Sequence, residues 1–220
     1  MLGMVIQLVL FPLPWRYRRW VLRRAFGYRI ARSAHIGYSL VLAGSVELAD
    51  GASIGHLTIL RGMDYVSLAQ HASIGPLNRI YAIQRGRGFF EQTPRRAELI
   101  LERGATITSR HVVDCSAAVH LGRQALVAGY HSQILTHSVN LSTGRQGVRP
   151  ISIEEGCLVG SSCIILGGSR LPHHSALVAG STLRHSYTTP YRIYAGVVAI
   201  DVGAIEETAG FFHRPLTGPW

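Results

Sequence analysis

The chain has 220 residues, which is enough for one domain with a sizeable core and short appendages. Only 15% of the residues are charged, and all 22 basic residues are arginine, giving a formal net charge of +10. Seven arginines and no acidic residue lie within 1–32, whereas the other 188 residues carry a net charge of only +3. This charge is concentrated at one end and does not form a basic face interleaved with aromatic residues, so we expect no nucleic-acid partner.

The N-terminal segment, 1–32, is predicted to be basic and amphipathic. Its apolar stretch, Met4–Pro14, is too short to cross a bilayer, and its arginines follow it instead of preceding it as in a signal peptide. A helix over 15–26 would place Tyr17, Trp20 and Val21 on one face and Arg16, Arg19 and Arg23 on the other. Two interpretations stay open: residues 1–28 contact an anionic membrane surface, or the helix caps the end of the fold described below.

Two ladders of aliphatic residues recur with a period of six. The first runs through Ile36, Leu42, Leu48, Ile54, Leu60 and Val66, and the second through Ile153, Val159, Ile165, Leu171, Leu177 and Leu183. Between them lie Leu101, Ile107 and Val113, and then Leu121 and Val127 after a two-residue shift in phase. A period of six fits neither an α-helix nor a long strand. It predicts short strands joined by tight corners, with one aliphatic side chain of each strand in a triangular interior.

The sequence therefore predicts an all-β fold, a parallel β-helix of hexapeptide repeats over 33–202 with about eighteen residues per coil. Two polar segments interrupt the repeat, near 84–97 and 138–150, and are expected to leave the coil as loops. The final segment, 203–220, is expected to form a C-terminal arm. The three cysteines, Cys115, Cys157 and Cys163, lack CxxC spacing, which favours buried thiols of a cytosolic protein.

Two stretches carry a family resemblance, SQILTHSV at 132–139 and RPISIEEGCLVGSSCIILGGSRLPHHSALVAGSTL at 149–183. Their order resembles that of the hexapeptide-repeat acyltransferases, especially the O-acetyltransferases of exopolysaccharide and lipopolysaccharide synthesis. The resemblance implies a left-handed β-helix, a homotrimer, and transfer of an acetyl group from acetyl-CoA to a hydroxyl of a sugar or glycolipid acceptor. It implies no metal. The cysteines indicate a cytoplasmic protein, which membrane contact through the N-terminal segment would bring to the inner face of the membrane.

The resemblance also implies roles for individual residues. His137 matches the family's general base, which takes a proton from the acceptor hydroxyl so that its oxygen attacks the thioester directly. The backbone N–H of Ser161 matches the donor that stabilises the thioester oxygen when it becomes negative. Gly160, Ser161 and Ala179 would line a trough for the pantetheine arm, while Arg184, His185 and Arg192 are candidates for contacts with the CoA phosphates.

A second pair, His111 and Asp114, lies on the coil that precedes His137. These two residues are candidates for acceptor binding or for orienting an imidazole across a subunit boundary, and a purely structural hydrogen bond is equally compatible with their spacing. Two other functions also remain open. A γ-type carbonic anhydrase has the same fold and holds zinc with three histidines, two of them five residues apart, whereas His131 and His137 are six apart. The other is a non-catalytic β-helix scaffold.

Overall fold

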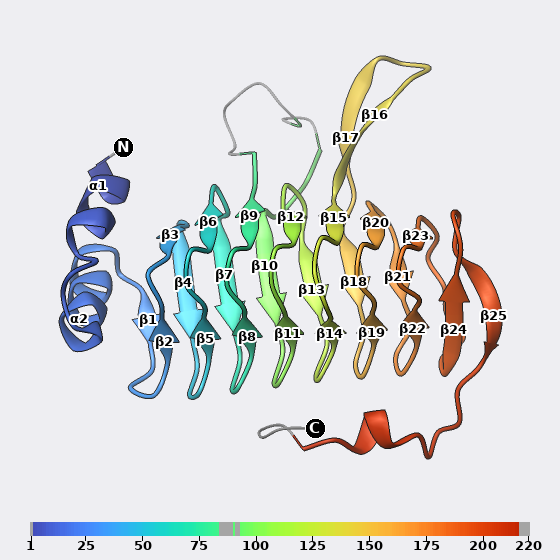
Figure 1. Cartoon of the computed structure of the whole chain (residues 1–220). Coiled ribbons are helices and arrows are strands. Elements are labelled where there is room, and N and C mark those ends of the chain that lie inside the picture. Colours follow the sequence, from blue (N-terminus) through green and yellow to red (C-terminus); the bar gives the residue numbers. More distant parts are fainter. Residues whose placement is uncertain (1, 84–89, 91–92, 216–220) are drawn as a thin grey trace.

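Short strands follow one another along the chain and stack into three parallel sheets, as Figure 1 shows for this computed structural model. The structure describes residues 2–83, 90 and 93–215. Together the three sheets form a left-handed parallel β-helix, so the predicted fold class is confirmed. We call the sheets faces A, B and C, and the turns between them the A–B, B–C and C–A corners.

The strands alternate among the three faces along the chain. Face A contains β1 (Arg29–Ile30), β4 (Ser45–Leu48), β7 (Tyr65–Leu68), β10 (Glu98–Leu101), β13 (Val119–Leu121), β18 (Ile151–Ile153) and β21 (Arg170–Leu171). Face B contains β2 (His35–Ile36), β5 (Ser53–Ile54), β8 (Ser73–Ile74), β11 (Thr106–Ile107), β14 (Leu126–Val127), β19 (Leu158–Val159), β22 (Ala176–Leu177), β24 (Arg192–Ala195) and β25 (Ile200–Ala204). Face C contains β3 (Leu40–Leu42), β6 (Ile59–Arg61), β9 (Arg79–Tyr81), β12 (Val112–Asp114), β15 (Gln133–Leu135), β20 (Ile164–Leu166) and β23 (Thr182–Leu183). β25 runs antiparallel to β24 and ends the coil.

The aliphatic ladders form the core between the three faces. All six members of the second ladder, from Ile153 to Leu183, are buried, as the period of six predicts. In the first ladder Leu42 is wrong, because Val41 is buried in its place and Leu42 is only partly buried. The reason is that the inward residues Ile36, Val41 and Val46 follow one another at intervals of five residues and not six.

Coil length varies because strands of face A contribute either one or two inward residues and because the corners differ in length by about one residue. In β4, for example, both Val46 and Leu48 are buried. Ile36 pairs in register with Ile54, eighteen residues later, but Ile54 pairs with Ile74, twenty residues later. The two-residue shift in phase noted in the sequence is therefore the extra inward residue of a longer strand on face A.

Two helices, α1 (Leu2–Val9) and α2 (Trp15–Ala25), cover the N-terminal end of the coil (Figure 1). Gln7 is buried and exchanges two hydrogen bonds with the backbone of Val41, so its amide extends the open edge of face C. Arg18 is buried and donates to the carbonyl of Gly37 at 2.6 Å. These contacts establish the capping interpretation of the N-terminal segment. No helix in the described ranges is long and apolar enough to span a membrane.

Both predicted excursions leave the coil at the C–A corner. The second one is an antiparallel hairpin of β16 (His137–Asn140) and β17 (Arg145–Val148) and not an irregular loop. In the first, predicted near 84–97, residues 84–89 and 91–92 lie outside the described residues. At the C-terminus a 3-10 helix, Gly210–His213, is followed by Arg214, which exchanges hydrogen bonds with Gln124.

Candidate active site

His137 begins the hairpin at the C–A corner, immediately after the last residues of β15 (Figure 1). Its Nδ1 lies 2.7 Å from Oδ2 of Asp114, the final residue of the neighbouring strand β12. A carboxylate can only accept a hydrogen bond, so Nδ1 carries the ring proton and Nε2 of the neutral imidazole keeps a lone pair. The side chain of His137 is 31% exposed, and a base of this kind needs access to its substrate.

Asp114 is held by an extensive set of donors. Its Oδ1 accepts from the backbone N–H and the hydroxyl of Ser116, and its Oδ2 accepts from the N–H and hydroxyl of Thr136 and from the N–H and Nδ1 of His137. The Asp114 side chain is fully buried. Burial by itself raises the pKa of this carboxyl group, but the hydrogen bonds from Ser116, Thr136 and His137 outweigh it, so the pKa lies below its ordinary value. Asp114 is therefore ionised at neutral pH and fixes both the tautomer and the orientation of the imidazole.

An apolar wall stands beside the imidazole. The ring of Phe90, from the first excursion, lies 6.1 Å from the His137 ring, centroid to centroid, and packs with Ala117 and Val148. Arg95 anchors this region by donating to the carbonyls of Ser116 and Ile83. Both excursions therefore contribute to the surroundings of His137. The wall lowers the local dielectric, which strengthens the interaction of His137 with Asp114.

The structure contradicts an acceptor-binding role for His111. This residue is fully buried, and both ring nitrogens are engaged inside the protein. Its Nδ1 accepts from the N–H of Ser132 at 3.1 Å, and its Nε2 lies 2.9 Å from Oγ1 of Thr108, which donates to the carbonyl of Gly129. The structural alternative therefore holds for His111. Its predicted companion Asp114 has a different role, because it orients His137 within the same chain.

The buried His111 predicts a pH dependence of stability. Burial lowers the pKa of His111 to about 4, whereas in the unfolded chain it is about 6.5. The unfolded chain therefore binds this proton more readily, so stability is complete above pH 6.5 and falls by about 3 kcal/mol as the pH drops to 4. Denaturant unfolding across this range measures the fall. In His111→Asn, whose amide oxygen can still accept from Ser132, this loss is expected to disappear; an unchanged pH profile would contradict the assignment.

Gly160, Ser161 and Ala179 lie together, but at a different corner from His137. Gly160 and Ser161 follow β19 and Ala179 follows β22, so all three belong to the B–C corner. A Cβ atom at Gly160 would lie 2.6 Å from the backbone nitrogen of Ala179, so only glycine allows these coils to stack closely. Neither Ser161 nor Ala179 donates a backbone hydrogen bond within the described ranges. The N–H groups that are paired are those of Gly160 and Ser162 beside Ser161, and those of Val178 and Gly180 beside Ala179. The N–H groups of Ser161 and Ala179 are therefore available to a ligand.

His137 and Ser161 lie at opposite edges of face C. Strand β20 begins just after the B–C corner that holds Ser161, and its neighbour β15 ends just before His137. Strand residues rise about 3.3 Å each, so a three-residue strand and its corners exceed by far the roughly 3 Å that a shared reacting atom requires. His131 belongs to the B–C corner and is likewise separated from His137.

The three basic candidates for CoA phosphates are distributed over two corners. Arg184 and His185 follow β23 and are exposed at the same C–A corner as His137. Arg192 begins β24 at the A–B corner, and its Nε donates to Asp201 at 2.6 Å. Arg192 is thus paired with an acidic side chain and lies at the far edge of face B from Ala179, and its contact with a CoA phosphate stays a prediction.

Three residues of the site were not assigned by sequence reasoning: Ser116, Thr136 and Phe90. The Thr-His dipeptide at 136–137 was a usable signal, because the threonine hydroxyl holds the same carboxylate oxygen as the histidine, at 2.7 Å. The Phe89-Phe90 dipeptide in an otherwise polar excursion was a second signal. Ser116 offered none, since serine is common in turns.

Among proteins of known structure, the fold is shared with an O-acetyltransferase and an N-acyltransferase. The polysialic acid O-acetyltransferase OatWY superposes with a TM-score of 0.60 over 86% of this chain and 92% of that chain, at 14% identity. AntD, an N-acyltransferase from Bacillus cereus solved with dTDP and 3-hydroxybutyryl-CoA, superposes with a TM-score of 0.54 over 89% of this chain and 92% of that chain, at 14% identity. No protein-family model and no curated protein matches the chain by sequence. The comparisons thus confirm the resemblance at the level of the fold.

Proposed function

We propose that this protein is an acyl-CoA-dependent O-acyltransferase that moves an acetyl group to a sugar hydroxyl in surface polysaccharide biosynthesis. The observation that carries the proposal is the pairing of the fully buried carboxylate of Asp114 with the accessible imidazole of His137. A scaffold would have no need of a histidine held by a buried anion at an exposed corner. The structural neighbours support the acyl donor, since AntD was crystallised with 3-hydroxybutyryl-CoA.

The reaction requires one base and one donor for the developing negative charge. Nε2 of His137 takes the proton from the acceptor hydroxyl while the hydroxyl oxygen attacks the carbonyl carbon of the thioester. The carbonyl oxygen becomes negative in the tetrahedral intermediate, where a backbone N–H stabilises it. When the C–S bond breaks, the CoA sulfur leaves and receives the proton from His137, which returns to its neutral form.

We infer that a homotrimer completes this site. His137 is at the C–A corner and the N–H of Ser161 is at the B–C corner, so one chain cannot bring both to a single thioester. In a trimer about an axis parallel to the coil, the C–A corner of one subunit faces the B–C corner of the next. This arrangement places Arg184 and His185 beside the same cleft, where they can reach the CoA phosphates.

The direct test is thiol release from acyl-CoA by the purified protein. Acetyl-CoA and 3-hydroxybutyryl-CoA serve as donors, and a sugar with free hydroxyls is compared with its amino-sugar analogue. Acetyl transfer to the hydroxyl sugar supports the proposal, while transfer to the amine alone would replace it with N-acylation. A well-folded protein that transfers nothing to either acceptor would favour a scaffold.

Enlarging Ala179 tests the position of the donor. Ala179 is exposed at the B–C corner beside the N–H of Ser161, so a leucine there would fill the trough proposed for pantetheine. For Ala179→Leu we expect KM for acyl-CoA to rise by about tenfold or more, with kcat little changed, in line with 1–3 kcal/mol for a misfit in an apolar slot. Ser109→Leu enlarges the same corner on an earlier coil and should leave this KM unchanged. Equal effects of both substitutions would contradict the trough.

A further inference from the structure

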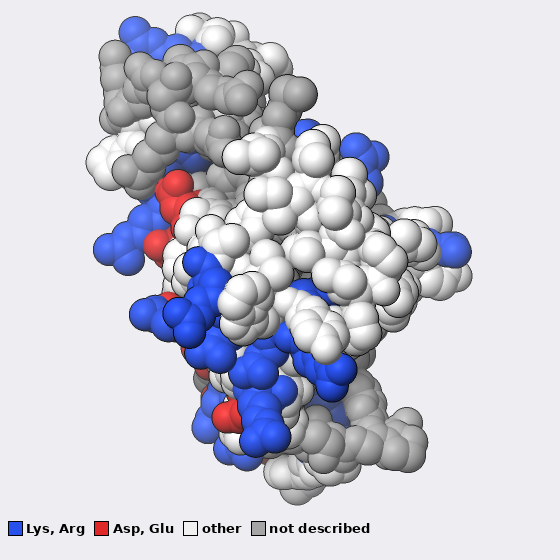
Figure 2. All heavy atoms as spheres, turned by 90° about the vertical axis from the view of Figure 1, so that its left-hand side faces the viewer, with Lys and Arg blue, Asp and Glu red and all other residues white. Residues whose placement is uncertain are grey.

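The N-terminal end of the molecule has an unusually apolar surface. Helix α1 buries only Gln7 completely, and its large apolar side chains are exposed, with Leu2 at 75%, Val9 at 69% and Val5 at 50%. On helix α2, Trp20 is 63% exposed. Figure 2 views the molecule from this side and shows a continuous area without charges, bordered by a band of arginines.

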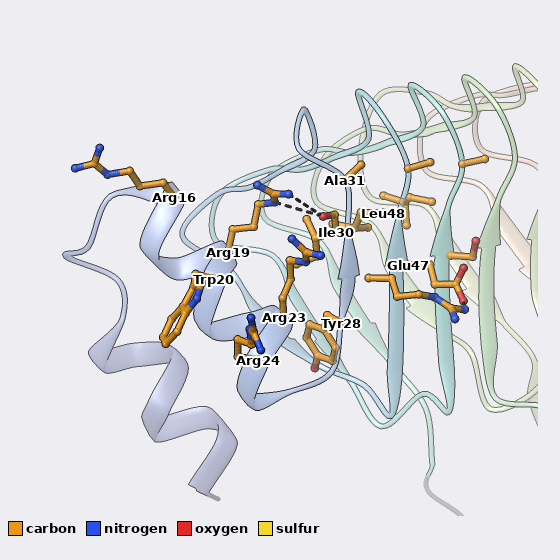
Figure 3. Close-up of a pocket in the computed structure, with 15 residues that line it drawn as sticks. Arg16, Arg19, Trp20, Arg23, Arg24, Tyr28, Ile30, Ala31, Glu47 and Leu48 are labelled. Atoms are coloured by element: carbon orange, nitrogen blue, oxygen red, sulfur yellow. Dashed lines mark hydrogen bonds and ion pairs between the residues drawn. The ribbon is translucent and has the colours of Figure 1, made fainter.

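The arginine band lines a groove between α2 and the first strands of face A (Figure 3). The groove has a volume of about 760 Å³, and its charged lining residues are Arg16, Arg19, Arg23, Arg24, Arg29 and Glu47. Arg29 forms an ion pair with Glu47, which leaves the other four arginines without a compensating acidic side chain in this lining. The side chains of Arg23 and Arg24 form no hydrogen bond or ion pair within the described ranges.

Capping of the coil does not explain these arginines. The capping contacts come from Gln7 and Arg18, and the guanidinium of Arg18 also lies over the rings of Phe11, Trp15 and Tyr38. Among the groove arginines of α2, Arg19 alone hydrogen-bonds to the coil in the described residues, through two long contacts of 3.3 Å to the carbonyl of Ile30. The groove therefore concentrates positive charge that the folded chain itself does not use.

We propose that this end of the molecule binds the surface of an anionic phospholipid bilayer. The exposed side chains of α1 enter the interfacial region, and the groove between α2 and face A takes the phosphate of a lipid headgroup. Guanidinium groups bind phosphate oxygens bidentately, and Trp20, which lines the groove, is the kind of residue enriched at the membrane interface. This proposal goes beyond acyl transfer and does not depend on it.

Charge complementarity favours a bilayer over a second copy of the chain. Two copies that met through this end would bring their arginine grooves together, and the chain has 22 arginines but only 12 acidic residues to oppose them. A bilayer with anionic lipids provides negative charge and an apolar layer at the same surface.

The test is sedimentation of the full chain with vesicles of one part phosphatidylglycerol to two parts phosphatidylcholine. We expect binding to these vesicles, weak binding to phosphatidylcholine alone, and release as salt is raised. Arg23→Gln/Arg24→Gln should lower the partition coefficient by about 30-fold, since each arginine near such a surface is worth about fivefold. Val5→Asp/Val9→Asp should also weaken binding, because both side chains are exposed and can be changed without disturbing the core.

The matched control is Arg103→Gln/Arg110→Gln, which removes the same charge from exposed positions on the middle coils. It should bind as the wild type does. Circular dichroism confirms that each variant is folded, and size-exclusion chromatography with light scattering reveals self-association. The proposal is overturned if folded wild-type protein does not bind the anionic vesicles, if it binds neutral vesicles equally well, or if both arginine pairs have equal effects. Because no step requires turnover, failure of acyl transfer would leave this result interpretable.

Discussion

His137→Ala is expected to lower kcat for acyl transfer by about 10²- to 10⁴-fold, the usual contribution of a general base. The substitution removes the imidazole whose Nε2 is proposed to accept the hydroxyl proton. KM for acyl-CoA should change little, because the donor is proposed to bind at the B–C corner of a neighbouring subunit. Thiol release at saturating acceptor measures the loss, and the free energy of unfolding should stay close to that of the wild type because the side chain is partly exposed.

The chain offers a matched control in His120. This histidine also pairs with a carboxylate, at 2.9 Å from Oε1 of Glu102, and its side chain is 37% exposed, close to the 31% of His137. It lies on face A, however, and not at the corner. His120→Ala should keep full turnover. If His137→Ala retains wild-type kcat, or if both alanine variants lose activity equally, the assignment of His137 as the base is wrong.

The repeat could be predicted from the sequence because a buried aliphatic residue is required at every short strand. The period of six identified the second ladder correctly, since the strands after Ile153 have one inward residue each and are joined by corners of equal length. It misplaced Leu42, because Ile36 and Val41 are only five residues apart and the sequence does not show which corners are one residue shorter. Handedness rested on resemblance, as the inward pattern is the same for either hand.

The partnership between Asp114 and His137 could not be predicted for the same reason. Counting eighteen residues from Asp114 leads to Ser132, whereas Asp114 pairs in register with Leu135, twenty-one residues later. The second inward residue of β13 adds two residues, and the B–C corner at 128–132 is one residue longer than the corresponding corner after Val159. Sequence reasoning therefore found both residues as candidates but assigned the aspartate to acceptor binding or to a subunit boundary.

The sequence predicted the two faces of the helix over 15–26 but left open which of its residues contact the coil. An apolar face of Tyr17, Trp20 and Val21 would normally pack on the core. Instead the structure buries Arg18 and Leu22, because the open end of a β-helix presents backbone carbonyls as well as apolar side chains. A guanidinium group satisfies such a carbonyl, and the aromatic residues are then left on the outer surface.

Asp114→Ala is expected to lower the free energy of unfolding by about 3–5 kcal/mol, because it removes a fully buried acceptor that several donors share. The substitution leaves donors of Ser116, Thr136 and His137 unsatisfied in a buried site, and each such group costs about 1–3 kcal/mol. Because the pKa of Asp114 is lowered in the folded chain, its contribution is complete above the unfolded pKa of about 3.9 and is lost as the pH falls through the folded value. Denaturant unfolding at neutral and acidic pH measures both effects.

The control for stability is Asp50→Ala, which removes an exposed carboxylate that accepts from the hydroxyl of Ser33 and should change the free energy of unfolding by less than about 0.5 kcal/mol. Catalysis separates a positioning role from a structural one. We expect Asp114→Asn to lower kcat even at temperatures where the variant is fully folded. An amide does not favour the tautomer of His137 that carries its proton on Nδ1. Combining Asp114→Asn with His137→Ala should then add almost no further loss, since both changes remove the same base. Additive losses in the double variant would mean that Asp114 supports the corner alone and does not act through the imidazole.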